Sequence, residues 1–299
     1  YVWDYAAGSG GFLISAMKLM LKDVEQQYKS SPEKYADKVS DIKKYQLLGC
    51  EIRPDIYLLA VLNMILMKDG SATILNVDSL AKFTGTYEQG DKKGQKFPAD
   101  VFLLNPPYSA DGKGFVFVEK ALSRMKSGKA CVLIQENAGS GNGLPYTKSL
   151  LKNNTLLASV HMADIFRGKA SVQTAVYLFE VGKTHDINKY VKFVDFSDDG
   201  YTRQNRKKSS QEVNLRDTGN AIERYQEVVD LILGRKKLTD CTYINDEIYI
   251  EDKITDKGDD WTFKQHKVID ITPTEDDFKK VVADFLAWKV GAMIRGEIN

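Results

Sequence analysis

Short apolar segments alternate with helical patterns through the first two thirds of this 299-residue chain. We expect helices over residues 10–28, 54–68 and 114–126, and strands near residues 2–4, 46–50, 72–76, 101–104 and 129–134. Further strands near 156–161, 172–180 and 190–195 should complete the sheet. Strands that alternate with helices are typical of a parallel sheet covered by helices. The sequence therefore predicts an α/β fold with a doubly wound, mostly parallel sheet and a smaller, partly helical C-terminal region.

The first predicted strand leads through a glycine-rich turn into a helix. The strand ends at Asp4, and Gly8-Ser9-Gly10-Gly11 forms the turn. Glycines permit a tight turn and close approach to a ligand, while the helix N-terminus offers amide donors. Neither the Gly-Lys-Ser/Thr ending of phosphate loops nor the Gly-x-Gly-x-x-Gly spacing is present. We therefore expect a nucleotide-like ligand other than a nucleoside triphosphate or NAD.

Two more acids follow predicted strands. Glu51 comes after the strand near 46–50, where doubly wound nucleotide folds place an acid that binds ribose hydroxyls. Asp78 follows the strand near 72–76. Ligands of such sheets bind in the crevice outside the carboxyl ends of the strands. The three acids are therefore expected to surround one ligand.

The segment Asn105-Pro106-Pro107-Tyr108 follows the apolar run 101–104. Two consecutive prolines fix φ and remove two backbone donors, so a stiff turn is expected at the strand's end. The Asn105 side-chain oxygen and the Pro106 carbonyl could accept both hydrogens of an exocyclic amine, and Tyr108 could stack on a planar base. Accepting both hydrogens favours a pyramidal nitrogen with a released lone pair, which suits amine methylation.

Taken in order, these motifs resemble those of the amino-group DNA methyltransferases, and most closely the modification (M) subunit of type I restriction-modification systems, in the N6-adenine DNA methylase family. The resemblance covers residues 1 to about 195 and extends through Val132-Leu133-Ile134 and the segment 174–179. It implies a Rossmann-like methyltransferase domain over 1–195 that uses S-adenosyl-L-methionine. Residues 196–299 would be a separate region, with subunit or DNA contact as its expected role.

The resemblance also implies roles for single residues. In the family, the glycine-rich turn holds S-adenosylmethionine, the second acid binds ribose and the third contacts the cofactor's adenine. The implied cofactor-binding residues are Asp4, Ala6, Gly8, Ser9, Gly10, Gly11, Phe12, Glu51 and Asp78. The implied catalytic residues, which bind a flipped target adenine, are Asn105, Pro106, Pro107 and Tyr108. The methyl group would pass directly to adenine N6, without a covalent enzyme intermediate.

The implied partners are DNA, a specificity (S) subunit and a restriction (R) subunit. Two positions depart from the family pattern: Tyr5 replaces a usual proline, and Gln135-Glu136 replaces a proline after the fifth strand. Three alternatives stay open: a protein glutamine-N5 methyltransferase, an RNA guanine-N2 methyltransferase, and a non-catalytic assembly subunit.

Composition narrows the class of protein. The formal net charge is +1, so DNA binding would depend on local patches. The cysteines Cys50, Cys131 and Cys241 form no Cys-x-x-Cys pair and none follows a proline, which favours a reduced, cytoplasmic protein and excludes a Pro-Cys nucleophile. Three scattered histidines give no basis for a metal site. No membrane span is expected, and the apolar stretch 58–67, interrupted by Asn63, fits a buried helix.

The remaining segments are more polar. The stretch 85–98 is expected to be an exposed loop, and basic clusters at 203–208 and 235–237 are expected to be solvated, with phosphate contact as the alternative. A helix is expected over 219–233 and a strand over 242–250. Thr272-Pro273-Thr274-Glu275 predicts a helix start, and the apolar stripe that follows would pack on the core or on a partner subunit. Because the chain starts inside its first strand without Met, we expect it to belong to a longer protein.

Overall fold

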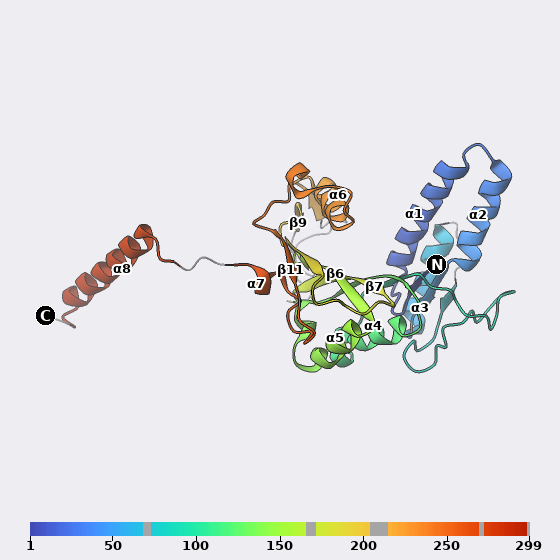
Figure 1. The fold of residues 1–299 in the computed structure, drawn as a ribbon, viewed down its shortest axis with the longest axis horizontal. Coiled ribbons are helices and arrows are strands. Elements are labelled where there is room, and N and C mark those ends of the chain that lie inside the picture. Colours follow the sequence, from blue (N-terminus) through green and yellow to red (C-terminus); the bar gives the residue numbers. More distant parts are fainter. Residues whose placement is uncertain (68–72, 166–171, 204–214, 269–271, 298–299) are drawn as a thin grey trace. The chain divides into compact units, whose positions relative to one another are not determined.

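The computed structural model describes residues 1–67, 73–165, 172–203, 215–268 and 272–297. The chain divides into two compact units, Tyr1–His266 and Lys267–Asn299. The first unit contains the sheet and its covering helices, and the second contains helix α8 (Glu275–Ile294) (Figure 1).

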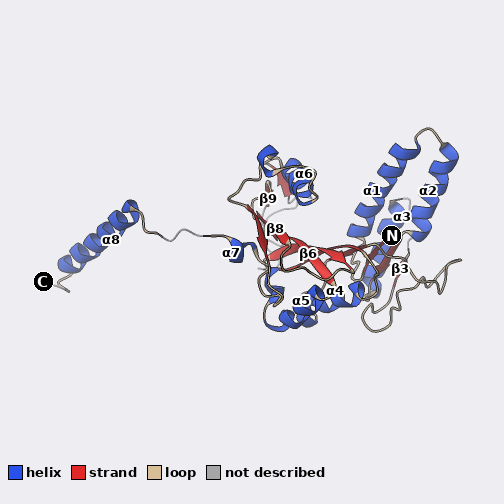
Figure 2. Cartoon of the chain, in the orientation of Figure 1, coloured by secondary structure: helices blue, strands red, loops and turns tan. Residues whose placement is uncertain are grey.

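Nine strands of the described residues form one sheet, in the order β11-β8-β6-β7-β5-β4-β1-β2-β3. Figure 2 shows strands in red and helices in blue. Their bounds are β1 (Val2–Asp4), β2 (Leu47–Cys50), β3 (Ile74–Leu75), β4 (Val101–Leu104), β5 (Gly128–Gln135), β6 (Asn154–Met162), β7 (Thr174–Val181), β8 (Tyr190–Phe196) and β11 (Tyr249–Lys253). Within the row β5-β4-β1-β2-β3 every pair of adjacent strands runs parallel, and so do β6 and β8. Strand β7 runs antiparallel to β5 and β6, and β11 runs antiparallel to β8. The predicted α/β class with a mostly parallel sheet is confirmed.

Alternate residues of the central strands enter two different cores. On one face, Val2 and Leu47 pack with side chains of α1 (Gly11–Tyr28) and α3 (Pro54–Leu66). On the other face, Trp3 and Leu48 belong to a core that includes side chains of α4 (Phe115–Leu122) and α5 (Leu144–Leu151). This alternation follows from the two-residue period of a strand. Packing on both faces holds in place the strands whose carboxyl ends carry the predicted site.

In the N-terminal half, the sequence analysis missed one helix and predicted the burial of another wrongly. Helix α2 (Pro32–Tyr45) was not predicted, although Ser31 precedes a proline at its first turn, and it packs beside α1 (Figure 1). The apolar run in α3 was expected to be buried, but only Ala60 and Met64 of this helix are buried. Leu62, for example, is 56% exposed. A helix on one face of a sheet buries a single stripe, so the outer leucines of α3 meet no neighbouring layer.

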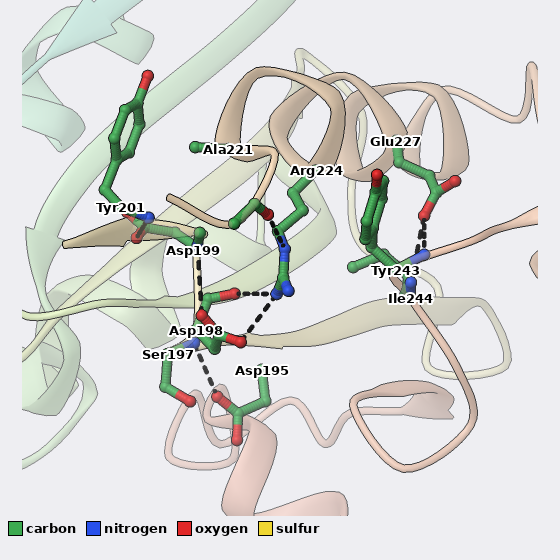
Figure 3. Close-up of polar contacts among 12 residues, drawn as sticks. Asp195, Ser197, Asp198, Asp199, Tyr201, Ala221, Arg224, Glu227, Tyr243 and Ile244 are labelled. Carbon is green, nitrogen blue, oxygen red and sulfur yellow. Dashed lines mark hydrogen bonds and ion pairs between the residues drawn. The ribbon is translucent and has the colours of Figure 1, made fainter. Parts of the chain in front are cut away.

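Two other predicted elements have different bounds in the structure. The helix predicted over 114–126 ends at Leu122 as α4. The strand predicted over 242–250 is β11, which starts only at Tyr249. Residues before it are held as a loop, because the buried Glu227 carboxylate accepts hydrogen bonds from the amides of Thr242, Tyr243 and Ile244 (Figure 3). These bonds use the backbone donors that a strand would have offered to the sheet.

Residues after β8 form a small polar module around α6 (Ala221–Ile232), which confirms the helix predicted there. A two-stranded antiparallel sheet joins β9 (Tyr201–Arg203) to β10 (Leu215–Asp217). Arg224 of α6 donates to both the backbone and the carboxylate of Asp198 (Figure 3). A short helix, α7 (Phe263–His266), ends this unit.

Two cations of the predicted basic clusters form ion pairs with buried carboxylates. Arg203 pairs with Asp199, which is 1% exposed. Lys236 lies 2.6 Å from a Glu227 oxygen. Both cations therefore support local structure. Ala72, Phe166 and the basic residues at 206–208, which also belong to predicted features, lie outside the described residues.

The second unit confirms the predicted helix. The Thr274 hydroxyl accepts from the Asp277 amide, and the Asp277 carboxylate accepts from the Thr274 amide, so this capping box starts α8. Large apolar side chains of the predicted stripe, such as Phe278 and Phe285, are exposed. Their packing partner stays a prediction. Within the described residues, no helix is long and apolar enough to cross a membrane.

Candidate active site

The glycine-rich turn joins β1 to α1 at the carboxyl edge of the sheet. Gly8 and Gly10 have φ angles of 55° and 83°, which residues with a Cβ rarely adopt. The carboxylate of Asp4, buried under the turn, accepts a hydrogen bond from the Ala6 amide at 2.9 Å. These features explain why an acid and two glycines occur at this spacing.

Glu51, directly after β2, is bonded to the same turn. One carboxylate oxygen accepts from the Gly8 amide at 3.0 Å, and the other accepts from the Arg53 amide at 2.8 Å. The Asn76 side-chain amide donates to the Glu51 carbonyl at 2.8 Å. Glu51 is thus held by hydrogen bonds from three places: the glycine-rich turn, the backbone two residues further along the chain, and Asn76 after β3.

Asp78 follows β3 and starts a turn. Its Oδ1 atom accepts hydrogen bonds from the amides of Leu80 at 2.9 Å and Ala81 at 3.0 Å. The neighbouring Ser79 hydroxyl donates to the Tyr5 carbonyl at 2.7 Å. The segment that carries Asp78 is therefore hydrogen-bonded to the turn after β1.

The Asn-Pro-Pro-Tyr turn follows β4, next to β1 in the sheet. The Tyr108 hydroxyl donates to Asn105 Oδ1 at 3.0 Å. Pro106 is buried, while Asn105 and Pro107 are exposed. Burial raises the pKa of Tyr108 to about 12, so its hydroxyl keeps its proton at neutral pH.

One cavity of about 470 Å³ brings these strand ends together. Its lining includes eight of the thirteen predicted site residues: Ala6, Gly8, Glu51, Asp78, Asn105, Pro106, Pro107 and Tyr108. The other lining residues are Tyr5, Ile52, Arg53, Ile56, Ser79 and Phe117. A volume of this size suits a small molecule or cofactor. The mixed apolar and polar lining suits a ligand with flat rings and hydroxyl groups.

Five predicted residues are not among the lining residues of this cavity: Asp4, Ser9, Gly10, Gly11 and Phe12. Asp4 is buried at 2% exposure, and Gly11 is the first residue of α1. The structure therefore places Asp4 as a support of the turn, and the individual roles of all thirteen residues stay predictions.

The two departures from the family pattern are accommodated by packing. The Tyr5 ring packs edge-on against Trp3 and Phe102, and its hydroxyl accepts from Arg124 at 3.1 Å. Glu136 pairs with His161, and its carbonyl accepts from the Tyr177 hydroxyl at 3.0 Å. Both Tyr5 and Glu136 are thus hydrogen-bonded to other elements of the sheet unit.

Sequence reasoning missed the residues that support the site. Asn63 of α3 donates to the Ser9 carbonyl at 3.0 Å, which anchors the glycine-rich turn. The sequence did indicate a special role for Asn63, because it is a lone amide side chain in an apolar helix. Asn76 and Ser79 follow a predicted strand, so a role beside the site could have been predicted for them as well. Arg124 could not have been found in this way, because it contacts Tyr5 from 119 positions away in the sequence.

The electrostatics of the site centre on Asp4. Burial raises the pKa of the Asp4 carboxyl to about 7, the nearby Glu51 charge adds to this effect, and the Ala6 amide opposes it. The Asp4 carboxyl, with its pKa raised to about 7, therefore keeps its proton in part at neutral pH.

Residues 1–116 match the family model described as N-6 DNA Methylase. The match covers the part of the chain that contains the glycine-rich turn, Glu51, Asp78 and the Asn105 turn. The chain is also 28% identical over 309 residues to the type II restriction enzyme and methyltransferase RM.BcgI of Heyndrickxia coagulans, in an alignment that covers 99% of the chain and 44% of that relative.

Solved structures share the fold of this chain. The modification subunit of a putative type I restriction enzyme from Vibrio vulnificus YJ016 matches with a TM-score of 0.57 and 19% identity, over 84% of the chain and 50% of that subunit. A chain from a type I R-M system, solved in a study of complex assembly and conformational transition, matches with a TM-score of 0.62 and 15% identity, over 100% of this chain and 62% of that one. The chain thus spans about half the length of these relatives.

Proposed function

We propose that this chain is the catalytic part of an adenine-N6 DNA methyltransferase that uses S-adenosyl-L-methionine and acts as the modification subunit of a type I restriction-modification system. The observation that carries the proposal is the single cavity lined by Gly8, Glu51, Asp78 and the turn from Asn105 to Tyr108. The match of residues 1–116 to the family model described as N-6 DNA Methylase supports it.

The lining residues fit the cofactor in their chemistry. A carboxylate such as that of Glu51 accepts hydrogen bonds from ribose hydroxyls. Backbone around Gly8 can approach the ligand closely, and Asp78 would face the adenine ring. The negative charge of the Glu51 carboxylate, which lines the cavity, favours the positive charge of the cofactor. When bound, S-adenosylmethionine supplies an electrophilic methyl group.

The Asn105 turn would act on the target amine. The Asn105 side-chain oxygen and the Pro106 carbonyl would accept both hydrogens of adenine N6, so the nitrogen lone pair leaves conjugation with the ring. Tyr108 would stack on the base after the base has left the duplex. In the structure the Tyr108 hydroxyl donates a hydrogen bond to Asn105 Oδ1. This bond would break when the target amine binds to the same oxygen.

Methyl transfer from labelled cofactor is the direct test of this function. The full-length protein, with its partner subunits, would be given duplex DNA, RNA and a glutamine-containing protein as separate substrates. Label in DNA adenine supports the proposal. Label in protein glutamine or RNA guanine supports one of the rival enzymes, and cofactor binding without transfer to any substrate supports an assembly subunit.

We further propose that DNA sequence is selected by a separate S subunit and that an R subunit completes the complex. A formal net charge of +1 gives the chain little general attraction for a duplex. Residues 196–299 are proposed to serve subunit or DNA contact. Gel shifts with residues 1–299 alone should show no sequence-selective, submicromolar DNA binding, and such binding would exclude this dependence on partners.

A further inference from the structure

The central strands of the sheet are tightly covered on one face only. On the face that carries α4 and α5, side chains such as Val132 of β5 and Tyr177 of β7 are 0% exposed. On the other face, Leu103, Cys131 and Leu178 lie side by side in the register of β4, β5 and β7, and all three are only partly buried. Sheets with parallel strands normally carry helices on both faces. We call the partly buried side chains the central strip, which consists of Leu103, Cys131, Leu133, Val176 and Leu178.

The described helices on this face lie to either side of the central strip. Helices α1 and α3 pack with Val2 of β1 and Leu47 of β2. Helix α6 packs with Val160 of β6 and Val194 of β8. The pairing register places these four side chains on the same face as the central strip. Because β4, β5 and β7 lie between the two groups in the sheet, the central strip separates two covered regions.

An apolar cavity of about 240 Å³ lies where the central strip meets α6. Its lining includes Cys131, Val176 and Leu178 from the strip, and Val229 and Leu233 from α6. Val229 is 43% exposed and Leu233 is 51% exposed. Apolar side chains that stay exposed on both sides of a cavity mark a place where a further apolar surface packs.

The described helices from α1 to α7 do not supply this surface. Helices α1, α2 and α3 pack at one end of this face, and α6 packs at the other. Helices α4 and α5 pack on the opposite face, and Phe263 of α7 belongs to that opposite core as well. A helix that covers the central strip would therefore come from outside the run from β1 to α7, as far as the structure describes it.

The position of Tyr1 favours a segment that precedes β1. The Tyr1 carbonyl accepts hydrogen bonds from the amides of Asp100 and Val101, each at 3.0 Å, so the polypeptide enters β1 directly beside the start of β4. About half of each relative named above lies outside the part that aligns with this chain. A helix upstream of Tyr1 would need only a short connection to reach the strip, whereas a segment after α7 starts from the opposite face of the sheet.

We propose that, in the full-length protein, an amphipathic helix from the polypeptide upstream of Tyr1 packs its apolar side on the central strip and fills the cavity beside α6. Its other side would be polar, because that side faces solvent. The helix would also support β4, the strand that leads into Asn105, from the face opposite to α4. The inference goes beyond the proposed function, because it concerns packing that does not depend on the substrate.

Thiol labelling of the full-length protein under native conditions tests whether the cavity is covered. Leu233→Cys places a thiol at the cavity. Ile222→Cys is the matched control, because Ile222 belongs to the same helix, is 68% exposed and does not line the cavity. We expect maleimide to label Leu233→Cys at least about tenfold more slowly than Ile222→Cys, since the reaction needs access to the thiol. A smaller difference would overturn the proposal, because the cavity would then be open.

A photoreactive residue identifies the occupant of the cavity. Benzoylphenylalanine in place of Leu233 would be irradiated in the purified full-length protein with its partner subunits, and peptide mass spectrometry would locate the crosslink. The same replacement at Lys120, an exposed residue of α4 on the opposite face, is the control.

The proposal predicts a crosslink from position 233, and not from position 120, to a peptide upstream of Tyr1. A crosslink from position 233 to α8, to a second copy of the chain or to a partner subunit would overturn it, as would the absence of any crosslink. Neither readout involves methyl transfer, so this inference and the proposed function can fail separately.

Discussion

Replacement of Glu51 by glutamine tests how the cofactor half of the site works. The substitution keeps the size of the side chain but removes the charge and leaves one oxygen to accept hydrogen bonds. In the structure, the two carboxylate oxygens accept from the amides of Gly8 and Arg53. One of these amides therefore loses its acceptor, and the proposed ribose contact is weakened.

The expected loss follows from one charged hydrogen bond. Such a bond contributes about 1.5–3 kcal/mol, and Glu51 is only partly buried, so we take about 2 kcal/mol. This loss corresponds to about 30-fold weaker binding of S-adenosylmethionine. Isothermal titration calorimetry measures it directly. Glu25→Gln, at an exposed position of α1, is the control and should leave the affinity unchanged.

The refuting result is equally specific. If Glu51→Gln binds the cofactor within about twofold of the wild-type protein and unfolds at the same temperature, Glu51 does not hold the ligand. The cavity would then have to bind its ligand through other groups, and the assignment of the ribose end would be abandoned.

Three further substitutions test other parts of the site. Asn105→Ala should lower methyl transfer by at least about 100-fold, as loss of a preorganised acceptor does, with little change in cofactor affinity; near-normal turnover would remove Asn105 from the chemistry. The raised pKa of Asp4, about 7, means that the folded protein holds a proton that the unfolded chain loses near pH 4, so this group's contribution to stability falls as pH rises from about 4 to 7; Asp4→Asn should abolish that part of the pH dependence in urea titrations, and an unaltered dependence would show that Asp4 is ionised throughout. Arg124→Met removes the donor to Tyr5 and should raise the KM for cofactor about tenfold, the scale of one hydrogen bond to a charged group, at unchanged kcat; a fall in kcat alone would contradict its positioning role.

Short apolar runs in the sequence were enough to predict where four strands end and which polar residues follow them. Asp4, Glu51, Asp78 and Asn105 each follow a short apolar run, and parallel pairing of β1 with β2 and β4 brings three of these ends to one edge. The order of strands in the sheet did not need to be known, because parallel strands share the direction of their carboxyl ends.

Features that depend on distant contacts could not be read from local pattern. The antiparallel placement of β7 between β5 and β6 depends on pairing across the sheet, which the periodicity of a strand does not encode. The exposure of α3 has the same cause, since an apolar run looks alike whether or not a second layer covers it. The lysine at positive φ in position 113 was likewise invisible, because a backbone angle has no side-chain signature there.

The most direct test of the central claim is a crystal structure of the full-length protein with S-adenosylhomocysteine. The account predicts that the ligand occupies the cavity between the glycine-rich turn and Tyr108, with its ribose at Glu51, its adenine beside Asp78 and its sulfur facing Asn105. A ligand bound elsewhere on the sheet, or bound in this cavity with its sulfur turned away from Asn105, would contradict the claim that these strand ends form one methyl-transfer site.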